Sequence, residues 1–448
     1  MITLLMFCWF PFVIYLFTRF PPQRALIISF IAAWLFLPQA AIKLPSIPVI
    51  YNRMSATSFG VLFATCLYDF GRFKSFRLHW FDIPMLVWCL CPFASSITND
   101  LGAYDGLSGT IGQTVAWGIP YFLGRIYLNN FAGMRQLAIG VLLGGLIYAP
   151  LCLFESVARI NLHGLIYRFQ LSGQTAQFAL RLGGYRPAVF LEHGLALSMW
   201  MMFVTLIGFV LWQTKVVKQI HNIPISWLVI LLLITFILLR STGAYFLLFA
   251  ALVVMFAAQQ YGISLLFWLL LGGMSIYLYL GVIGSFPGQQ IIDFLAQFID
   301  PARLQSLGFR FMNEELLSAK ARERILFGWA GYGRNMLYKE GGYAITVTDS
   351  LWIIAFGQNG LVGLISVFGA LLLPAANFWI RYPPSSWSHS NIIITASVTV
   401  GLAFYALDSI LNAMFDPIFI LAGGGITGII LSQQMQGILP RTSTRLVR

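Results

Sequence analysis

Long apolar runs recur along the whole chain, and most approach the roughly 20 residues that a helix needs to cross a lipid bilayer. Of the 448 residues, 59% are hydrophobic and 9% are charged, whereas soluble domains carry about 25% charged residues. Inside a bilayer the backbone has to satisfy its own hydrogen bonds, which favours helices over open sheets. The sequence therefore predicts an all-α, polytopic integral membrane protein with about 12–13 transmembrane helices.

Thirteen apolar runs are the predicted spans. The first run has neither a basic leading segment nor a small-residue cleavage site, so we expect a spanning helix and not a removable signal peptide. The five cysteines all lie within apolar runs, which argues against a disulfide framework or a zinc site. The spans cover roughly residues 2–18, 24–42, 55–70, 80–97, 108–125, 134–155, 189–212, 225–240, 243–259, 261–283, 349–380, 391–415 and 416–437.

Basic segments between the spans predict the orientation of the chain. Alternating passage through a membrane puts six of them on one side, namely 19–24, 71–79, 124–135, 213–222, 381–390 and the tail 440–448. Positive residues in short loops mark the cytoplasmic side. The acidic segment 97–109 falls on the opposite side. We therefore expect the C-terminus in the cytoplasm and, if the number of spans is odd, the N-terminus outside. We assign the net charge of +12 to this orientation, with no nucleic acid as a partner.

The chain divides into four parts along its length. Residues 1–155 form the N-terminal transmembrane helices, and 156–283 form the central helices with a basic outer segment at 156–189. Residues 284–348 form a large outer loop expected to contain amphipathic helices. Residues 349–448 form the C-terminal helices and a cytoplasmic tail. The basic outer segment contains no acidic residue, which favours an anion as its ligand; its arginines are Arg159, Arg168, Arg181 and Arg186.

Arg186 stands out because it directly precedes an apolar run. Pro187 follows it and is typical of a helix start. A guanidinium binds phosphate with two parallel hydrogen bonds, although an arginine at this depth also serves to reach lipid headgroups. Glu192 and His193 come next; a structural ion pair is the alternative role for Glu192. Their spacing matches no metal motif, so we expect no metal ion here.

Three further segments on the outer side carry charged candidates. Arg240 lies in a tight turn between two spans, where an anchoring role and a ligand-binding role have equal weight. The large loop predicts an amphipathic helix followed by a glycine-rich turn, with Arg310, Arg322 and Arg324 as candidates to face the membrane surface. That turn lacks the Lys-Ser/Thr pair of a phosphate-binding loop. Asp349 opens the next span, either as a functional carboxylate or as a helix N-cap.

These residues form a sensible set for one reaction on the outer side. Arginines neutralise a diphosphate leaving group, and a carboxylate takes a proton from a sugar hydroxyl. Because nucleoside triphosphates are absent outside the cytoplasm, the donor has to arrive activated on a lipid. We expect neither a cofactor nor a metal. The predicted catalytic residues are Asp349, Arg186 and Arg310, and the predicted substrate-binding residues are Arg181, Glu192, His193, Arg240 and Arg324.

Four segments between about 180 and 370 together resemble the O-antigen ligase and polymerase family. They are "YRPAVFLEHGLALS" (185–198), "LLRSTGAYFLL" (238–248), "RILFGWAGYG" (324–333) and a late signature at Asp349, Ser350, Ile353, Gln358, Gly360, Gly363 and Leu364. Three positions depart from the family pattern. Asp349 stands where the family has His, Gln358 where it has an acidic residue, and Glu192-His193 where it has Pro-Asn.

The resemblance implies a multi-pass enzyme of the bacterial inner membrane that acts at the periplasmic face on polyprenyl-diphosphate-linked glycans. It favours a polysaccharide polymerase of exopolysaccharide, capsule or O-antigen; the alternative is a ligase that moves finished glycan to a lipid or protein. Implied partners are the lipid-linked donor and acceptor, membrane lipids, and a chain-length regulator or export proteins. A transporter is the alternative from another class, although it would place charges near the bilayer midplane.

Overall fold

The computed structural model describes residues 2–43, 49–74, 76–175, 179–297, 301–387 and 389–435. Within this part the regular structure is helical apart from three two-stranded hairpins: β1 (Ile42–Lys43) with β2 (Ile50–Tyr51), β3 (Leu180–Arg181) with β4 (Gly184–Tyr185), and β5 (Gln219–Ile220) with β6 (Ile223–Pro224). The predicted all-α class is confirmed.

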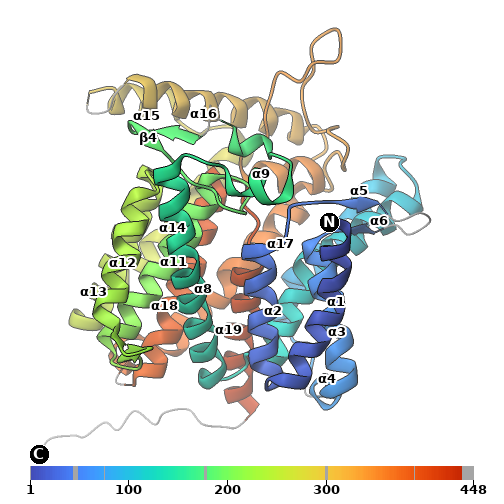
Figure 1. Ribbon diagram of the computed structural model, residues 1–448. Coiled ribbons are helices and arrows are strands. Elements are labelled where there is room, and N and C mark those ends of the chain that lie inside the picture. The colour runs from blue at the N-terminus through green and yellow to red at the C-terminus, as the bar shows by residue number, and fades with distance from the viewer. Residues whose placement is uncertain are drawn as a thin grey trace, which may run out of the picture.

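A bundle of roughly parallel and antiparallel helices forms the body of the molecule (Figure 1). Each of the thirteen predicted spans contains a helix of this bundle, and residues 436 and 437 of the last span lie outside the described residues. In chain order the bundle comprises α1 (Ile2–Arg19), α2 (Pro22–Phe36), α3 (Arg53–Tyr68), α5 (Ile83–Thr98), α6 (Ala103–Gln113) continued by η2 (Thr114–Gly118) and α7 (Ile119–Tyr127), α8 (Phe131–Ala158), α11 (Gly194–Gln213), α12 (Ile225–Leu238), α13 (Thr242–Tyr261), α14 (Leu265–Ile283), α17 (Leu351–Arg381), α18 (Ser390–Leu411) and α19 (Pro417–Met435).

Length and hydropathy identify the protein as a multi-pass membrane protein. Within the described residues, eight helices are long and apolar enough to cross a membrane, and α2, α12 and α19 are shorter apolar helices. Many large apolar side chains point outward from α12, α13 and α14, among them Trp227, Phe246, Phe249 and Leu269. Such outward exposure is costly in water and favourable against lipid.

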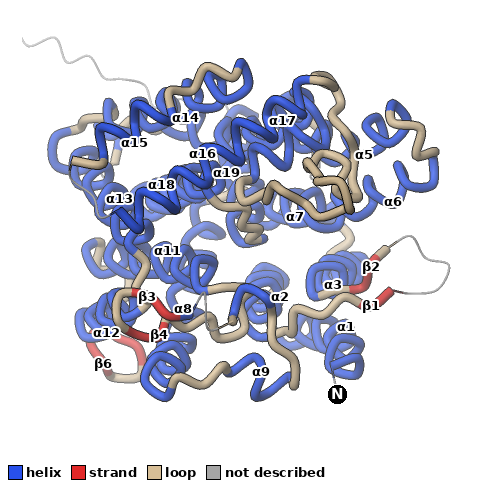
Figure 2. Tube along the Cα trace, turned by 90° about the horizontal axis from the view of Figure 1, so that it is seen from above, coloured by secondary structure: helices blue, strands red, loops and turns tan. Residues whose placement is uncertain are grey.

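The two ends of the bundle differ in what they carry (Figures 1 and 2). The loop end carries α9 (Leu162–Tyr167), the short turn η3 (Ser172–Gln174), the hairpin β3–β4, α15 (Gly288–Leu295) and α16 (Pro301–Arg322). The opposite end carries α4 (Gly71–Lys74), η1 (Trp80–Asp82), the hairpin β5–β6 and η4 (Pro384–Ser386). Five of the six basic segments predicted to share a side lie at this opposite end, hereafter the basic end; the sixth, 440–448, lies outside the described residues.

The start of α11 differs from the sequence prediction. The predicted span begins at 189 with Pro187 as a helix start, but the helix begins at Gly194 and the preceding residues are irregular. The carboxylate of Glu155, at the end of α8, accepts hydrogen bonds from the backbone N–H groups of Ala188 (2.9 Å) and Val189 (3.2 Å). These bonds satisfy the buried backbone without a helix, so the chain turns before it enters the bundle.

The predicted span 349–380 corresponds to α17, and this helix contains a break at Gly360 that the sequence did not predict. This residue has φ 66° and ψ −163°, a conformation that only glycine adopts readily. A Cβ at this position would lie 2.2 Å from the carbonyl oxygen of Leu326. The break therefore brings a segment of the large loop directly against the helix backbone.

Residues 325–330 supply the hydrogen bonds that the broken helix lacks. The N–H of Trp329 donates to the carbonyl of Gly357, and the N–H of Leu361 donates to the carbonyl of Ile325, each at 2.8 Å. Non-helical backbone at membrane depth is tolerated where protein buries and satisfies it. The two late segments that carry the family resemblance are thus in direct backbone contact with each other.

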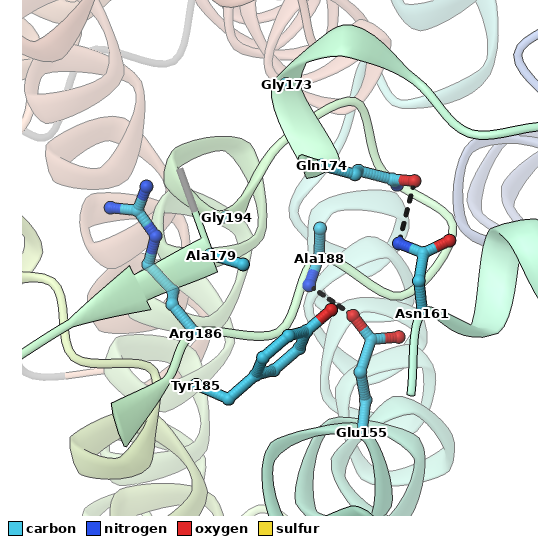
Figure 3. Close-up of a pocket in the computed structure, with 9 residues that line it drawn as sticks. All are labelled: Glu155, Asn161, Gly173, Gln174, Ala179, Tyr185, Arg186, Ala188 and Gly194. Carbon is cyan, nitrogen blue, oxygen red and sulfur yellow. Dashed lines mark hydrogen bonds between the residues drawn. The ribbon is translucent and has the colours of Figure 1, made fainter. Parts of the chain in front are cut away.

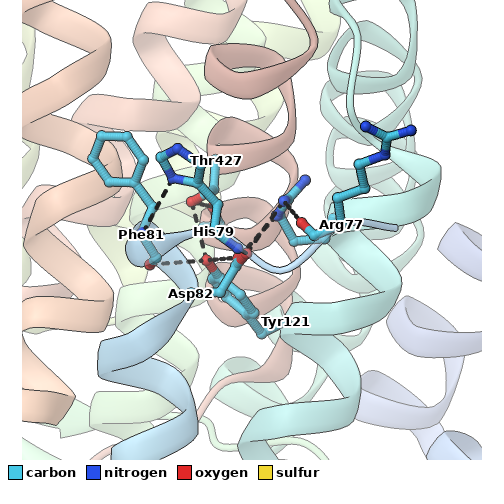
Figure 4. A network of polar contacts seen from close by, with 8 residues as sticks. Arg77, His79, Phe81, Asp82, Tyr121 and Thr427 are labelled. Carbon is cyan, nitrogen blue, oxygen red and sulfur yellow. Dashed lines mark hydrogen bonds and ion pairs between the residues drawn. The ribbon is translucent and has the colours of Figure 1, made fainter. Parts of the chain in front are cut away.

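A buried ion pair joins three helices near the basic end (Figure 4). The guanidinium of Arg125 in α7 donates to the carboxylate of Asp82 before α5, with Nε–Oδ1 at 2.9 Å, and both side chains are almost fully buried. The hydroxyl of Tyr121 donates to the same carboxylate at 2.9 Å and lies 3.3 Å from the hydroxyl of Thr427 in α19. This network fixes α5, α7 and α19 far from the loop end.

Candidate functional site

The eight predicted site residues all lie at the loop end of the bundle. Arg181 and Arg186 lie in or just after the β3–β4 hairpin, Glu192 and His193 directly precede α11, and Asp349 lies two residues before α17. The remaining three arginines belong to the α12–α13 turn, to α16 and to the segment after α16; they are Arg240, Arg310 and Arg324. The sequence prediction that these side chains share one end is therefore consistent with the chain path (Figure 1).

Arg186 is a largely buried cation. Its side chain is 7% exposed and packs on Gly194, where any Cβ would lie 2.6 Å from its Nε. Figure 3 shows its guanidinium directed away from Glu155, Asn161 and Gln174, which line the other side of a small pocket. Burial, together with the smaller effect of the Arg181 charge, lowers the pKa of Arg186 to about 10. The guanidinium is therefore still charged at neutral pH.

His193 is the N-cap of α11. Its Nδ1 accepts the backbone N–H of Ala196 at 3.1 Å, which leaves Nε2 to carry the proton of a neutral imidazole. Burial lowers the pKa of His193 below its usual value, against the raising effect of the Glu192 charge. The charges of Arg186 and Asp349 also act on this imidazole, in opposite directions. Three predicted site residues, Arg186, Glu192 and Asp349, thus lie within electrostatic reach of His193.

Asp349 presents an exposed carboxylate at the start of α17. The N-cap of that helix is the buried Ser350, so Asp349 lies one residue before the N-cap and does not cap the helix. The alternative role of a simple capping residue is wrong for this reason. Since the Asp349 charge reaches His193, the start of α17 faces the start of α11 across the loop end. The carboxylate is accessible to a proton donor from solvent or substrate.

Arg310 lies on α16, where the sequence predicted an amphipathic helix. Its charge acts on Asp408 in the last turn of α18 and on Glu314 one turn later in its own helix. Burial raises the pKa of Glu314, while hydrogen bonds from Tyr277 (2.5 Å) and Trp352 (3.1 Å) lower it. Glu314 was missed from sequence, although its place four residues after Arg310 puts both on one helix face.

Arg240 and Arg324 make contacts that hold the fold together. Nη1 of Arg240 donates to the carbonyl of Leu182 in the β3–β4 turn at 2.5 Å. Nη1 of Arg324 donates to the carbonyl of Thr98 at the end of α5 at 2.9 Å, and its guanidinium lies 4.6 Å from the ring centroid of Trp329. Both arginines therefore already bind the protein, and nothing brings them to His193.

Arg322, the third arginine expected at the membrane surface, is likewise engaged. Its Nη1 donates to the carbonyl of Val282 and to the hydroxyl of Ser318, each at 3.2 Å.

No group of three or more His, Cys, Asp or Glu side chains that could hold a metal ion occurs among the described residues. The chemistry available at the loop end is that of arginine cations, carboxylates and the imidazoles of His163 in α9 and His193 before α11.

Comparison with known proteins gives no independent identification. No model of a known protein family matches the chain, and no curated protein matches it. The resemblance of the four sequence segments therefore stands on their residues alone. The function has to be argued from the chemistry of the site.

Proposed function

We propose that this protein is a glycosyltransferase that joins polyprenyl-diphosphate-linked oligosaccharide repeat units at the periplasmic face of a bacterial inner membrane. The observation that carries the proposal is the group formed by Arg186, His193 and Asp349 at the end opposite the basic segments. It combines a buried cation, a neutral imidazole and an accessible carboxylate. The four segments that resemble the O-antigen ligase and polymerase family support the same reading.

Each group has a defined part in the proposed reaction. The hydroxyl oxygen of the acceptor sugar attacks the anomeric carbon of the donor, and the bond from that carbon to the diphosphate oxygen breaks. The electron pair leaves with the diphosphate, whose charge Arg186 and Arg310 stabilise. Asp349 takes the proton of the attacking hydroxyl. The Nε2–H of His193 donates to a substrate oxygen and orients it.

The departures from the family pattern are compatible with this scheme. Asp349 replaces a His, and a carboxylate serves as a base toward a hydroxyl that loses its proton as the new bond forms. His193 stands in a segment where the family has Pro-Asn, so an imidazole has moved from the α17 side of the site to the α11 side. Neither change alters the charge that the leaving group requires.

The test is a gel of surface polysaccharide and lipid-linked intermediates from cells carrying Arg186→Ala or Asp349→Asn. We expect loss of long chains and accumulation of single lipid-linked repeat units. Arg24→Ala, an exposed arginine at the basic end, and Asp105→Asn, a half-buried carboxylate in α6, are the matched controls. Both controls should leave the polysaccharide unchanged.

Two other outcomes decide against a polymerase. Full-length chains stranded on the lipid carrier would identify a ligase with the same chemistry. An unchanged polysaccharide pattern, with both variant proteins present in the membrane at normal amounts, would remove Arg186 and Asp349 from the reaction and reopen the transporter alternative.

A further inference from the structure

A second cavity lies beside the candidate site, between the end of α14, the helices α15 and α16, and the start of α17. Its volume is about 890 Å³, within the range of about 300–1,000 Å³ typical of small-molecule sites. None of the sequence motifs pointed to it. Its walls come from segments up to about 75 residues apart, between Tyr277 and Trp352.

The lining of the cavity combines aromatic rings with amides and carboxylates. Tyr277, Phe286 and Phe311 form an edge-to-face cluster, with ring centroids 4.7 Å apart for the first pair and 5.1 Å for the second. Gln289 and Gln305 add exposed amides from α15 and α16. The pattern therefore offers flat apolar surfaces next to hydrogen-bonding groups.

Glu314 is the most constrained polar group of the lining. One carboxylate oxygen accepts the hydroxyl of Tyr277 and the other accepts the indole N–H of Trp352. Each carboxylate oxygen has a second lone pair, so Glu314 retains acceptor capacity toward a ligand hydroxyl. Because Tyr277 and Trp352 hold the Glu314 carboxylate in place, its remaining lone pairs have a fixed orientation.

The charge of the lining selects among ligand classes. The two charged side chains that the structure describes in this lining are the carboxylates Glu314 and Glu315, and they repel an anion such as a phosphate headgroup. A long acyl chain would leave the carboxylates and amides without partners. A neutral sugar satisfies both parts of the wall, since its hydroxyls pair with amides and carboxylates while its C–H face packs on aromatic rings.

We propose that this cavity binds a neutral oligosaccharide and serves as the subsite for the acceptor glycan. The acceptor role of the cavity rests on the proposed function, whereas the binding of a neutral oligosaccharide does not. Arg310 lies one helical turn from Glu314, and its charge acts on that carboxylate. The cavity therefore adjoins the cation that would face the diphosphate, which is where an acceptor chain has to enter.

The test uses the full chain, purified in detergent, and labelled oligosaccharides made by partial hydrolysis of the surface polysaccharide of the cells that produce it. The fraction without charged groups is the probe. Ala296→Trp places a large side chain in the cavity wall and leaves the residue Glu314 itself unaltered, and Ala319→Trp makes the same change on an exposed face of α16 outside the cavity. We expect binding of the neutral fraction, a loss of at least about tenfold in affinity in Ala296→Trp, and no loss in Ala319→Trp.

The outcomes separate this inference from the proposed function. Absence of binding, equal affinity in the two variants, or binding only of anionic lipid vesicles overturns the cavity assignment even where Arg186→Ala abolishes long chains. Conversely, neutral-oligosaccharide binding that Ala296→Trp removes upholds the cavity as a glycan site even where the Arg186 and Asp349 variants leave the polysaccharide unchanged. In that case the cavity is a glycan-binding site without the acceptor role.

Discussion

Gly360 lies so close to Leu326 that a single added carbon would fall 2.2 Å from the Leu326 carbonyl oxygen. This contact fixes the break in α17 against the loop segment 325–330. It joins two segments whose order along the chain is given by the sequence but whose contact is not. The start of α17, and with it Asp349, depends on this junction for its position.

Substitution of Gly360 by Ala should therefore destabilise the protein strongly. The residue has φ 66°, which costs a non-glycine residue about 1–3 kcal/mol, and the contact with the carbonyl adds to that. Thermal unfolding in detergent measures the effect. Gly272→Ala in α14 is the control, because no atom lies within 4 Å of its added carbon. Equal melting temperatures for the two variants would contradict the broken helix.

The buried pair of Arg125 and Asp82 gives a second prediction. Asp82→Asn leaves the Arg125 charge buried without its counter-ion, which costs about 3–5 kcal/mol. Asp69→Asn removes the partner of Arg72 in a pair that is 25% and 40% exposed, and such surface pairs contribute about 0–1 kcal/mol. Denaturation of both variants in the same detergent compares the two costs. A small effect of Asp82→Asn would mean that the pair is hydrated.

Close packing of α7 on α19 gives a third prediction. A Cβ on Gly424 would lie 2.0 Å from the carbonyl oxygen of Tyr121, whereas a Cβ on the neighbouring Gly423 would meet only Leu402, at 3.6 Å. Small residues allow membrane helices to approach this closely. Gly424→Ala should lower the yield of folded protein in size-exclusion chromatography, and Gly423→Ala should not. Matching elution profiles would place the two helices farther apart.

The fold could be predicted from the sequence because each apolar run is long enough to indicate a helix by itself. The start of α11 could not be predicted in this way, because Pro187 is typical of a helix start. The non-helical backbone of Ala188 and Val189 is held by hydrogen bonds to Glu155, which is distant in sequence. The break at Gly360 could not be predicted for the same reason. The hydrogen bonds that satisfy the helix backbone at the break come from a segment about 30 residues away in sequence.

The candidate site was predictable in its location and only partly in its members. Arg186, His193 and Asp349 come together because topology puts the starts of α11 and α17 at one end. Arg240 and Arg324 were predicted from sequence as substrate-binding residues of the same site as Arg186. Their hydrogen bonds to backbone carbonyls of distant residues are tertiary contacts, which no local pattern reveals.

The environment of His193 predicts how stability depends on pH. Burial lowers its pKa in the folded protein below the unfolded value of 6.5. The unfolded chain therefore takes up a proton first as pH falls, and stability that is fully present above pH 6.5 is lost from there down to the lower folded pKa. His193→Asn keeps an acceptor for the α11 N-cap and removes the titrating group.

The measurement is the melting temperature in detergent between pH 7.5 and about 5. We expect the decline on acidification to be shallower in His193→Asn than in the unaltered protein. His389→Gln, an exposed histidine at the basic end, should retain the full decline. If His193→Asn declines as steeply as the unaltered protein, then His193 is accessible to protons in the folded state, and the imidazole proposed to orient the substrate is not held neutral by its surroundings.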